Sequence, residues 1–447
     1  ELARWLEQAR DWRVRANAAL ALEGRSRDPV ALEALLEALD NTSVHVRQSA
    51  GAALAAERQP APVVEAILAR IDEDPDDWRS AGPLLSVLAR SGRGGDVLAW
   101  ADRWPLDAVG PWTRISEALM TVAGDAALAR LVRAAGSESP PVASAALRAL
   151  ATRWPAERRR PGSHEAYWQA FSRAAGSADA VGLPVVAPVL ADPVFVARGS
   201  VPLLVGAWER LASQGDADAA AAVLAALGET GAPEADPTLR EALAHPDPRL
   251  ADAAAEALIA LAGDGTDGSP ADTAGAANGT ARRSTRGSAR EREVDWAFLG
   301  EMGPRPRLVL ETDEGRVVVA LVPEEAPVTV QTVARLAVEG RYDGVPFHRV
   351  IPTFVVQGGD VSRGDGTGGP GFSIPSELTS LRFLRGTAGM ASAGKDTEGS
   401  QFFLTHSPQP HLDGGYTAFG WVVEGMDVVD RLVEGQRILR ASVERGG

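Results

Sequence analysis

Few of the residues in this chain of 447 stand in a pattern that could bind a metal or attack a substrate. There is no cysteine, which excludes disulfides, thiolate metal sites and cysteine nucleophiles. The six histidines are scattered, and no two have the spacing of ligands on a helix. The acidic run 72–77 alternates carboxylates like a calcium loop, but Asp77 stands where the sharp turn requires Gly, and Pro83 where a bidentate Glu is required. We therefore expect no metal site.

Two glycine-rich segments match nucleotide-binding loops in spacing alone. Residues 364–369 fit the pattern GxGxxG, but Pro370 and Gly371 prevent the helix that must follow at a dinucleotide site. Residues 389–395 read GxxxxGK, yet Asp396 replaces the Ser or Thr that would hold magnesium in a phosphate-binding loop. We therefore expect no cofactor.

The remaining candidate is the segment 347–360, FHRVIPTFVVQGGD, which combines an arginine, aromatic residues and a glutamine. It closely resembles the cyclophilin-type peptidyl-prolyl isomerases. Several independent motifs in the expected order make a chance match negligible, and the resemblance spans residues 307–443, about a third of the chain. The further motifs are 326–330 (APVTV), 342–344 (YDG), 399–403 (GSQFF), 412–414 (LDG), 419–420 (FG) and 425–430 (GMDVVD).

The resemblance implies catalysis of rotation about X–Pro bonds, in which Arg349 and Gln357 act. Amide resonance opposes this rotation with a barrier of about 18–20 kcal/mol, and the reaction needs neither a nucleophile nor a cofactor. In the twisted amide the proline nitrogen regains a lone pair, so a fixed hydrogen-bond donor aimed at it stabilises that state selectively. Arg349 suits this role because its guanidinium is always charged and presents rigid donors. Gln357 is expected to bind the substrate backbone near Arg349.

The resemblance also implies an apolar pocket for the proline ring and a backbone segment that pairs with the peptide before the proline. Any one of these aromatic residues alone would be better explained as core packing, and only their occurrence together with Arg349 and Gln357 favours a pocket. The pocket residues implied are Phe354, Val355, Phe403 and Leu412, and the pairing segment is Ala391, Ser392 and Ala393.

Three substrate-binding positions depart from the family pattern. Tyr416 stands where many members have a His, and Ser392 where many have Asn, so we expect an altered rate or preference rather than loss of activity. His411 replaces the Trp that packs against cyclosporin in drug-sensitive members, which predicts weak inhibition by cyclosporin. His348 is expected to be a structural residue inside the barrel, because the reaction moves no proton.

Short strands joined by glycine-rich turns must position these residues. From Arg307 the pattern predicts a strand over 308–311, a turn over 313–315, a strand over 317–322, a helix over 328–338 and then further strands. We expect residues 294–447 to form a cyclophilin-like closed antiparallel β-barrel with one or two covering helices.

Residues 1–262 carry an internal repeat of about 32 residues. An apolar residue, an Ala four positions later and a Leu eight positions later fall on one face of a helix, and second helical stretches over 29–39 and 62–71 lie between copies. This pattern resembles HEAT-type repeats and predicts an all-α solenoid, although the repeats around 155–200 are hard to phase. The copies are Val14/Ala18/Leu22, Val46/Ala50/Leu54, Val142/Ala146/Leu150 and Leu250/Ala254/Leu258.

The composition divides the multidomain chain into three parts. Residues 263–293 hold no apolar side chain larger than Ala and predict a flexible linker between the two domains. The net charge of −15 argues against nucleic-acid binding, and no apolar run is long enough to span a membrane. We expect a soluble, bacterial protein of the cytoplasm or periplasm, with any leader hidden because the chain starts at Glu1.

Two functions compete from the sequence, and a third, general chaperone activity in which the solenoid covers unfolded chains, has no distinguishing residue. The first is a peptidyl-prolyl cis-trans isomerase that acts in protein folding on proline-containing clients, with the solenoid binding an unknown protein partner or the client. The second is a non-catalytic adaptor that binds Pro-containing segments through the barrel and partners through the solenoid. The joint presence of Arg349, Phe354, Gln357 and Phe403 favours the enzyme.

Overall fold

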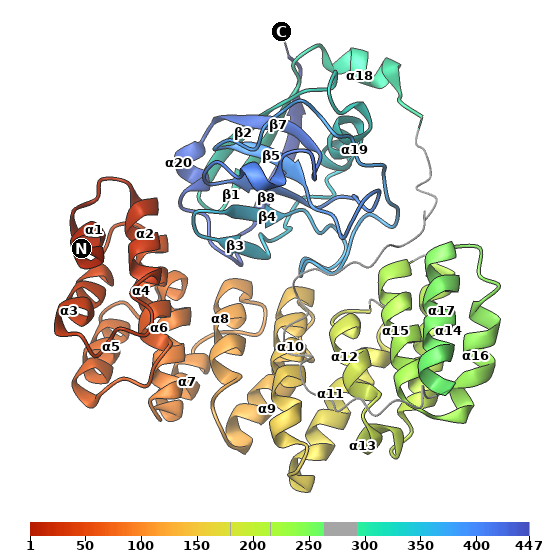
Figure 1. Ribbon diagram of the computed structural model, residues 1–447, viewed down its shortest axis with the longest axis horizontal. Coiled ribbons are helices and arrows are strands. Elements are labelled where there is room, and N and C mark those ends of the chain that lie inside the picture. Colours follow the sequence, from red (N-terminus) through yellow and green to blue (C-terminus); the bar gives the residue numbers. More distant parts are fainter. Residues whose placement is uncertain (179, 215, 263–292, 447) are drawn as a thin grey trace.

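The computed structural model describes residues 1–178, 180–214, 216–262 and 293–446 (Figure 1). Helices fill the part up to residue 262, and an antiparallel sheet dominates the part from 293 onward. The predicted linker, residues 263–293, lies outside the described residues except for Glu293. In the described ranges no helix is long and apolar enough to cross a membrane.

The helices of the first part alternate between two rows of an arc (Figure 1). The inner row consists of α2 (Trp12–Leu20), α4 (Val44–Ala55), α6 (Trp78–Arg90), α8 (Val109–Leu119), α10 (Pro140–Glu157), α12 (Leu183–Leu190), α15 (Ala217–Glu229) and α17 (Pro248–Ala262), each packed on the next. The remaining helices are α1 (Leu2–Gln8), α3 (Pro29–Ala38), α5 (Ala61–Glu73), α7 (Gly94–Ala101), α9 (Asp125–Ala134), α11 (His164–Gly176), α13 (Pro193–Val196), α14 (Ser200–Gln214) and α16 (Asp236–Ala242).

The repeated apolar triads form the seam between inner helices. In α4 the triad Val46/Ala50/Leu54 is completely buried, and so is Val142/Ala146/Leu150 in α10. Alanine at the centre of each triad allows neighbouring helices to approach closely. The first copy departs from this pattern because Val14, near the end of the arc, is 42% exposed.

The second part is built on one eight-stranded sheet with the order β3-β4-β6-β5-β7-β2-β1-β8. Every pair of neighbouring strands in this order is antiparallel. The strands are β1 (Arg307–Thr312), β2 (Gly315–Leu321), β3 (Arg349–Ile351), β4 (Val355–Gly358), β5 (Thr387–Met390), β6 (Phe402–Thr405), β7 (Ala418–Glu424) and β8 (Ile438–Glu444). Helices α18 (Trp296–Met302), α19 (Pro327–Val338) and α20 (Met426–Val429) accompany the sheet.

The expectation of a closed barrel is wrong, because the sheet curves into an open half-barrel with β3 and β8 at its edges. In the described chain these two strands are not paired with each other, and β3 is only three residues long. The segments that precede them meet instead, through an isolated bridge between Pro346 and Arg437 and backbone hydrogen bonds such as Phe347 N to Gln436 O at 2.7 Å.

Alternating apolar residues of the strands and one face of α19 form the core of this part. The hairpin β1–β2 contributes Leu308, Leu310, Val317 and Val319, all completely buried. Alternate residues of a strand point to the same face, which places these four side chains together. A second, smaller cluster around Phe403 lies apart from this core. Its members line the candidate site.

Candidate functional site

Three candidate residues lie side by side across the sheet edge because the strand register aligns them. Arg349 on β3 pairs with Gln357 on β4, and Gln357 pairs with Phe403 on β6. Directly opposed residues of neighbouring strands point to the same face. The next residue in the row is Gly389 on β5, where an added Cβ would lie 2.6 Å from the Phe403 ring. Glycine at this position leaves room for that ring.

A chain of hydrogen bonds holds the polar half of the row. Arg349 Nη1 donates to Gln357 Oε1 at 3.1 Å, and Gln357 Nε2 donates to Gln401 Oε1 at 3.2 Å. Gln401 Nε2 in turn donates to the carbonyls of Gly366 and Gly368, at 3.0 and 2.7 Å. Arg349 itself is exposed, with its guanidinium carbon 5.7 Å from the centre of the Phe354 ring. The guanidinium is therefore held on two sides while its other donors face outward.

The predicted pocket residues gather in the smaller apolar cluster. Val355, Phe403 and Leu412 are buried, and Phe354 and Tyr416 are half-buried at the rim. Phe383 stacks on Phe403 with ring centres 5.6 Å apart, which fixes the ring that forms the floor. The cluster thus offers an apolar patch beside the donors of Arg349.

The positions that depart from the family pattern also lie at this rim. His411, on the short 3-10 turn Pro410–Leu412, stacks on Phe354 with ring centres 5.7 Å apart. Tyr416 meets the edge of Phe403 at 6.1 Å. Both side chains therefore remain beside the pocket and can contact a substrate.

The segment 391–393 follows β5 on the far side of Phe403 from Arg349. The N–H of Ala391 donates to the carbonyl of Gln401 at 2.9 Å, and the N–H of Ala393 donates to Thr397 Oγ1 at 2.9 Å. Pairing with a peptide would therefore use the carbonyls of the segment and the N–H of Ser392.

Sequence reasoning missed the loop that supports the row, residues 360–369. The buried carboxylate of Asp360 accepts hydrogen bonds from the N–H groups of Ser362, Arg363, Asp365, Gly366 and Gly368, at 2.9 to 3.2 Å. Burial of Asp360 favours its neutral form, but these N–H donors outweigh it and lower its pKa. The loop so formed presents the two carbonyls that bind Gln401.

Asp360 and Gln401 both lie in segments that resemble family motifs, so their part in the site could have been predicted from the sequence. Phe383 lies in no such segment. His348 was expected inside the barrel, but its side chain lies elsewhere. It packs near Gly366 of the same loop and lines a cleft that faces helices α8 and α10.

Comparison with known proteins identifies a family for each of the two parts of the chain. The family model "Cyclophilin type peptidyl-prolyl cis-trans isomerase/CLD" matches residues 307–443, and "HEAT repeats" matches residues 1–82. A peptidyl-prolyl cis-trans isomerase of Synechococcus elongatus is 47% identical over 137 residues, which are 30% of this chain and 94% of that protein. Peptidyl-prolyl cis-trans isomerase B of Bacillus subtilis is 47% identical over 134 residues, 30% of this chain and 93% of that protein.

The fold of residues 307–443 and these matches define a cyclophilin-type domain. The chain belongs to the cyclophilin-type peptidyl-prolyl cis-trans isomerase family through residues 307–443, and its N-terminal part carries HEAT repeats.

Proposed function

We propose that Arg349 is the donor that this isomerase directs at the proline nitrogen. The observation that carries the proposal is the row of Arg349, Gln357 and Phe403 across three strands, with the donors beside an apolar patch. A proline ring on Phe403 and Leu412 would place its nitrogen near the guanidinium. In this geometry the donor interacts more strongly with the twisted amide than with the planar one, which is the requirement for catalysis.

The fixed position of Arg349 explains how one residue can have a large effect. Its bond to Gln357 and its place over the Phe354 ring hold the guanidinium before substrate arrives, so little reorganisation is needed in the transition state. A barrier lowered by about 7 kcal/mol would accelerate rotation by about 10⁵-fold. Gln357 and the segment 391–393 would hold the peptide backbone on either side.

We further propose that residues 294–447 form the catalytic domain, residues 263–293 a linker and residues 1–262 a solenoid that binds a partner or the client. The solenoid supports this division by having its own core, formed from the apolar residues of α1 to α17. A role in protein folding, with a bacterial cytoplasmic or periplasmic location, completes the proposal. The adaptor alternative is less favoured, because the aligned donors serve catalysis better than simple capture.

The test is the exchange rate between cis and trans forms of an Ala-Pro-Phe type peptide, measured by NMR with the full chain. We expect strong acceleration by the native chain and a loss of about 100-fold or more in kcat/KM for Arg349→Ala, as for other transition-state donors. The control is Arg341→Ala, an exposed arginine outside the row, which should change nothing. Equal rates for Arg349→Ala and the native chain would refute the role of Arg349.

A further inference from the structure

The solenoid contacts the isomerase domain with the N-terminal ends of its inner helices. Trp12 is the first residue of α2, His45 and Arg79 are the second residues of α4 and α6, and Asp216 caps α15. Trp12 and His45 pack on His406 of the isomerase domain, with ring centres 5.4 and 5.2 Å apart. The two parts therefore meet along the arc rather than at a single point (Figure 1).

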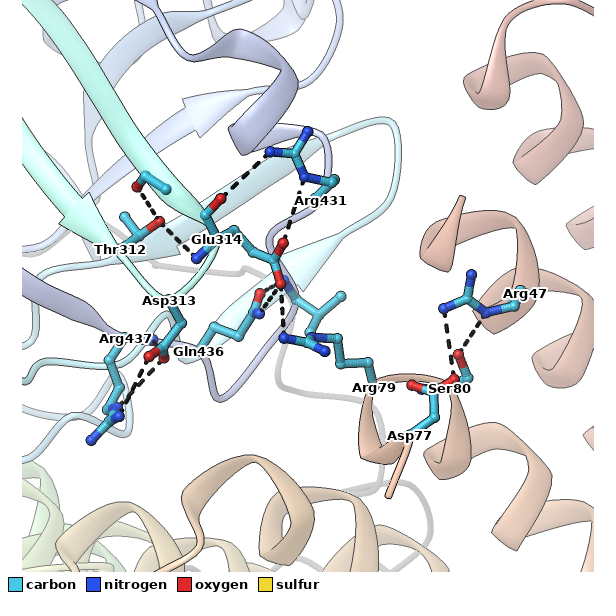
Figure 2. Close-up of polar contacts among 12 residues, drawn as sticks. Arg47, Asp77, Arg79, Ser80, Thr312, Asp313, Glu314, Arg431, Gln436 and Arg437 are labelled. Atoms are coloured by element: carbon cyan, nitrogen blue, oxygen red, sulfur yellow. Dashed lines mark hydrogen bonds and ion pairs between the residues drawn. The ribbon is translucent and has the colours of Figure 1, made fainter. Parts of the chain in front are cut away.

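Ion pairs fix the relative position of the two parts. Arg79 Nη2 lies 3.0 Å from Glu314 Oε1 in the turn between β1 and β2, where Arg431 and Gln436 also contact Glu314 (Figure 2). On the other side of the domain Arg363 pairs with Asp216. These contacts link the isomerase domain to α6 and to α15, on the two sides of α8.

Backbones touch in the middle of the arc. A Cβ on Gly435 would lie only 2.5 Å from the Cα of Gly110 on α8, so a side chain at position 435 would prevent this approach. Next to this contact the two parts separate, and a cleft of about 560 Å³ opens between them.

The cleft joins the candidate site to the solenoid. Arg349 and Gln357 form part of one wall, and residues of α8 and α10 form the other, among them Thr113, Ser144 and Ala145. The cleft therefore continues the row that begins at Phe403 and ends at Arg349.

The solenoid wall contains two serine hydroxyls without a hydrogen-bond partner in the described part of the chain. The hydroxyls of Ser116 on α8 and Ser144 on α10 are buried, and neither has a hydrogen-bond partner among the described residues. A buried hydroxyl without a partner is costly. Both serines line the cleft, so rotation of their side chains toward it would bring the hydroxyls to the N–H and C=O groups of an extended polypeptide.

We propose that this cleft binds the part of an unfolded client that follows the proline, so that the solenoid forms one wall of the substrate site. The proposal rests on the isomerase function and its pocket. The strand order supports the direction: the segment 391–393, assigned to the peptide before the proline, lies on one side of Phe403, and Arg349 with the cleft lies on the other. The occupant is thus an extended polypeptide that is already held at the neighbouring site.

The test narrows the cleft from its solenoid wall and compares peptide lengths. Ala145→Trp on α10 and Thr113→Trp on α8 place a large side chain in the cleft. Neither variant substitutes a residue of the isomerase domain. The matched control is Ala156→Trp, an exposed alanine of α10 that does not line the cleft. Substrates are a short X-Pro peptide and two longer ones, extended either before or after the proline.

We expect both cleft variants to raise KM about tenfold for the peptide extended after the proline and to leave kcat/KM for the other two peptides within about twofold. Ala156→Trp should behave as the native chain with all three. Circular dichroism melting of each variant identifies loss of folding, and agreement between the two cleft variants excludes a local defect of one helix.

Three outcomes would overturn the proposal. The first is no effect of either cleft variant, the second is an equal effect on all three peptides, and the third is faster turnover of the short peptide, which would make the solenoid a shield. Absence of acceleration by the native chain with every peptide would instead refute the isomerase function itself, so the two failures are distinguishable.

Discussion

The guanidinium of Arg349 combines exposure with a fixed position. One donor bonds Gln357, whose amide is itself fixed by Gln401, and the Phe354 ring lies beneath. Such support leaves the remaining N–H groups of Arg349 free to meet a substrate without first ordering a long, flexible side chain, whose immobilisation carries an entropic cost. Loss of Gln401 should therefore affect the reaction through Gln357 and Arg349 rather than by contact with substrate.

His411 is the residue at which cyclosporin sensitivity should differ from that of family members with Trp. Its ring stacks on Phe354 at the pocket rim, but it is smaller than an indole and buries less apolar area against a ligand. A loss of about 50 Å² of apolar contact corresponds to about 1.3 kcal/mol, close to tenfold in affinity. We expect His411→Trp to lower the inhibition constant of cyclosporin by about tenfold or more, measured as the loss of peptide isomerisation.

His411→Phe provides the matched control, because it keeps a flat ring on Phe354 without the larger area of an indole. Nanomolar inhibition of the native chain would contradict the prediction.

The segments next to the strands that carry Arg349 and Gln357 contact the solenoid. The turn between β3 and β4 places Thr353 in the left-handed region at φ 66°, and its hydroxyl donates to Asn17 Oδ1 of α2 at 3.3 Å. The loop 360–369, organised by Asp360, contacts the solenoid through Arg363 and Asp216. Both segments that flank Arg349 and Gln357 therefore contact the helical arc.

The sequence predicted some of these elements well and others not at all. Local patterns are enough for the strands at 308–311 and 317–322, the helix at 328–338 and the buried triads of α4 and α10, because each depends on the alternation of apolar residues along one element. The open edge between β3 and β8 could not be predicted, since it depends on how strands far apart in the sequence are placed in the sheet. The contact of Gly110 with Gly435 joins residues far apart in the chain, and no local pattern marks it.

Two histidines at the contact of α4 with the isomerase domain should make the assembly sensitive to acid. Burial lowers the pKa of His45 to about 3, with neighbouring His406, Arg114 and Arg47 acting in the same direction. Burial likewise lowers the pKa of His406, against the opposing effect of Asp430. Above about pH 6.5 neither the folded nor the unfolded chain protonates them, whereas below it only the unfolded chain does, so stability falls as the pH falls toward the folded-state value.

We expect the melting temperature to fall between pH 7.5 and 5.5, with a loss of up to about 1.4 kcal/mol per pH unit for each histidine. The measurement is calorimetry of the native chain and of His45→Phe, in which the dependence on pH should be weaker. His164→Phe, at a half-buried histidine of the solenoid, should leave the dependence unchanged. An identical dependence in the native chain and in His45→Phe would contradict the expectation.

On the scale of the whole molecule, two acidic parts are held together by local charge complementarity. Residues 1–262 carry a net charge of −9 and residues 294–447 one of −6, so long-range electrostatics do not favour their contact. The solenoid overcomes this by presenting arginines, Arg79 and Arg114, to the acidic residues Glu314 and Glu434. The arc of helices thereby becomes part of the surroundings of the candidate site, where we propose that a client contacts both parts.

The refolding of a client protein limited by one X–Pro isomerisation tests this view most directly. The full chain should accelerate that slow phase. The Arg349→Ala variant should still bind the unfolded client, but its acceleration should be lower by about 100-fold or more. Retention of full acceleration in Arg349→Ala would place catalysis elsewhere. Tight binding of the client by the native chain with no acceleration would mean that the molecule is an adaptor and not an enzyme.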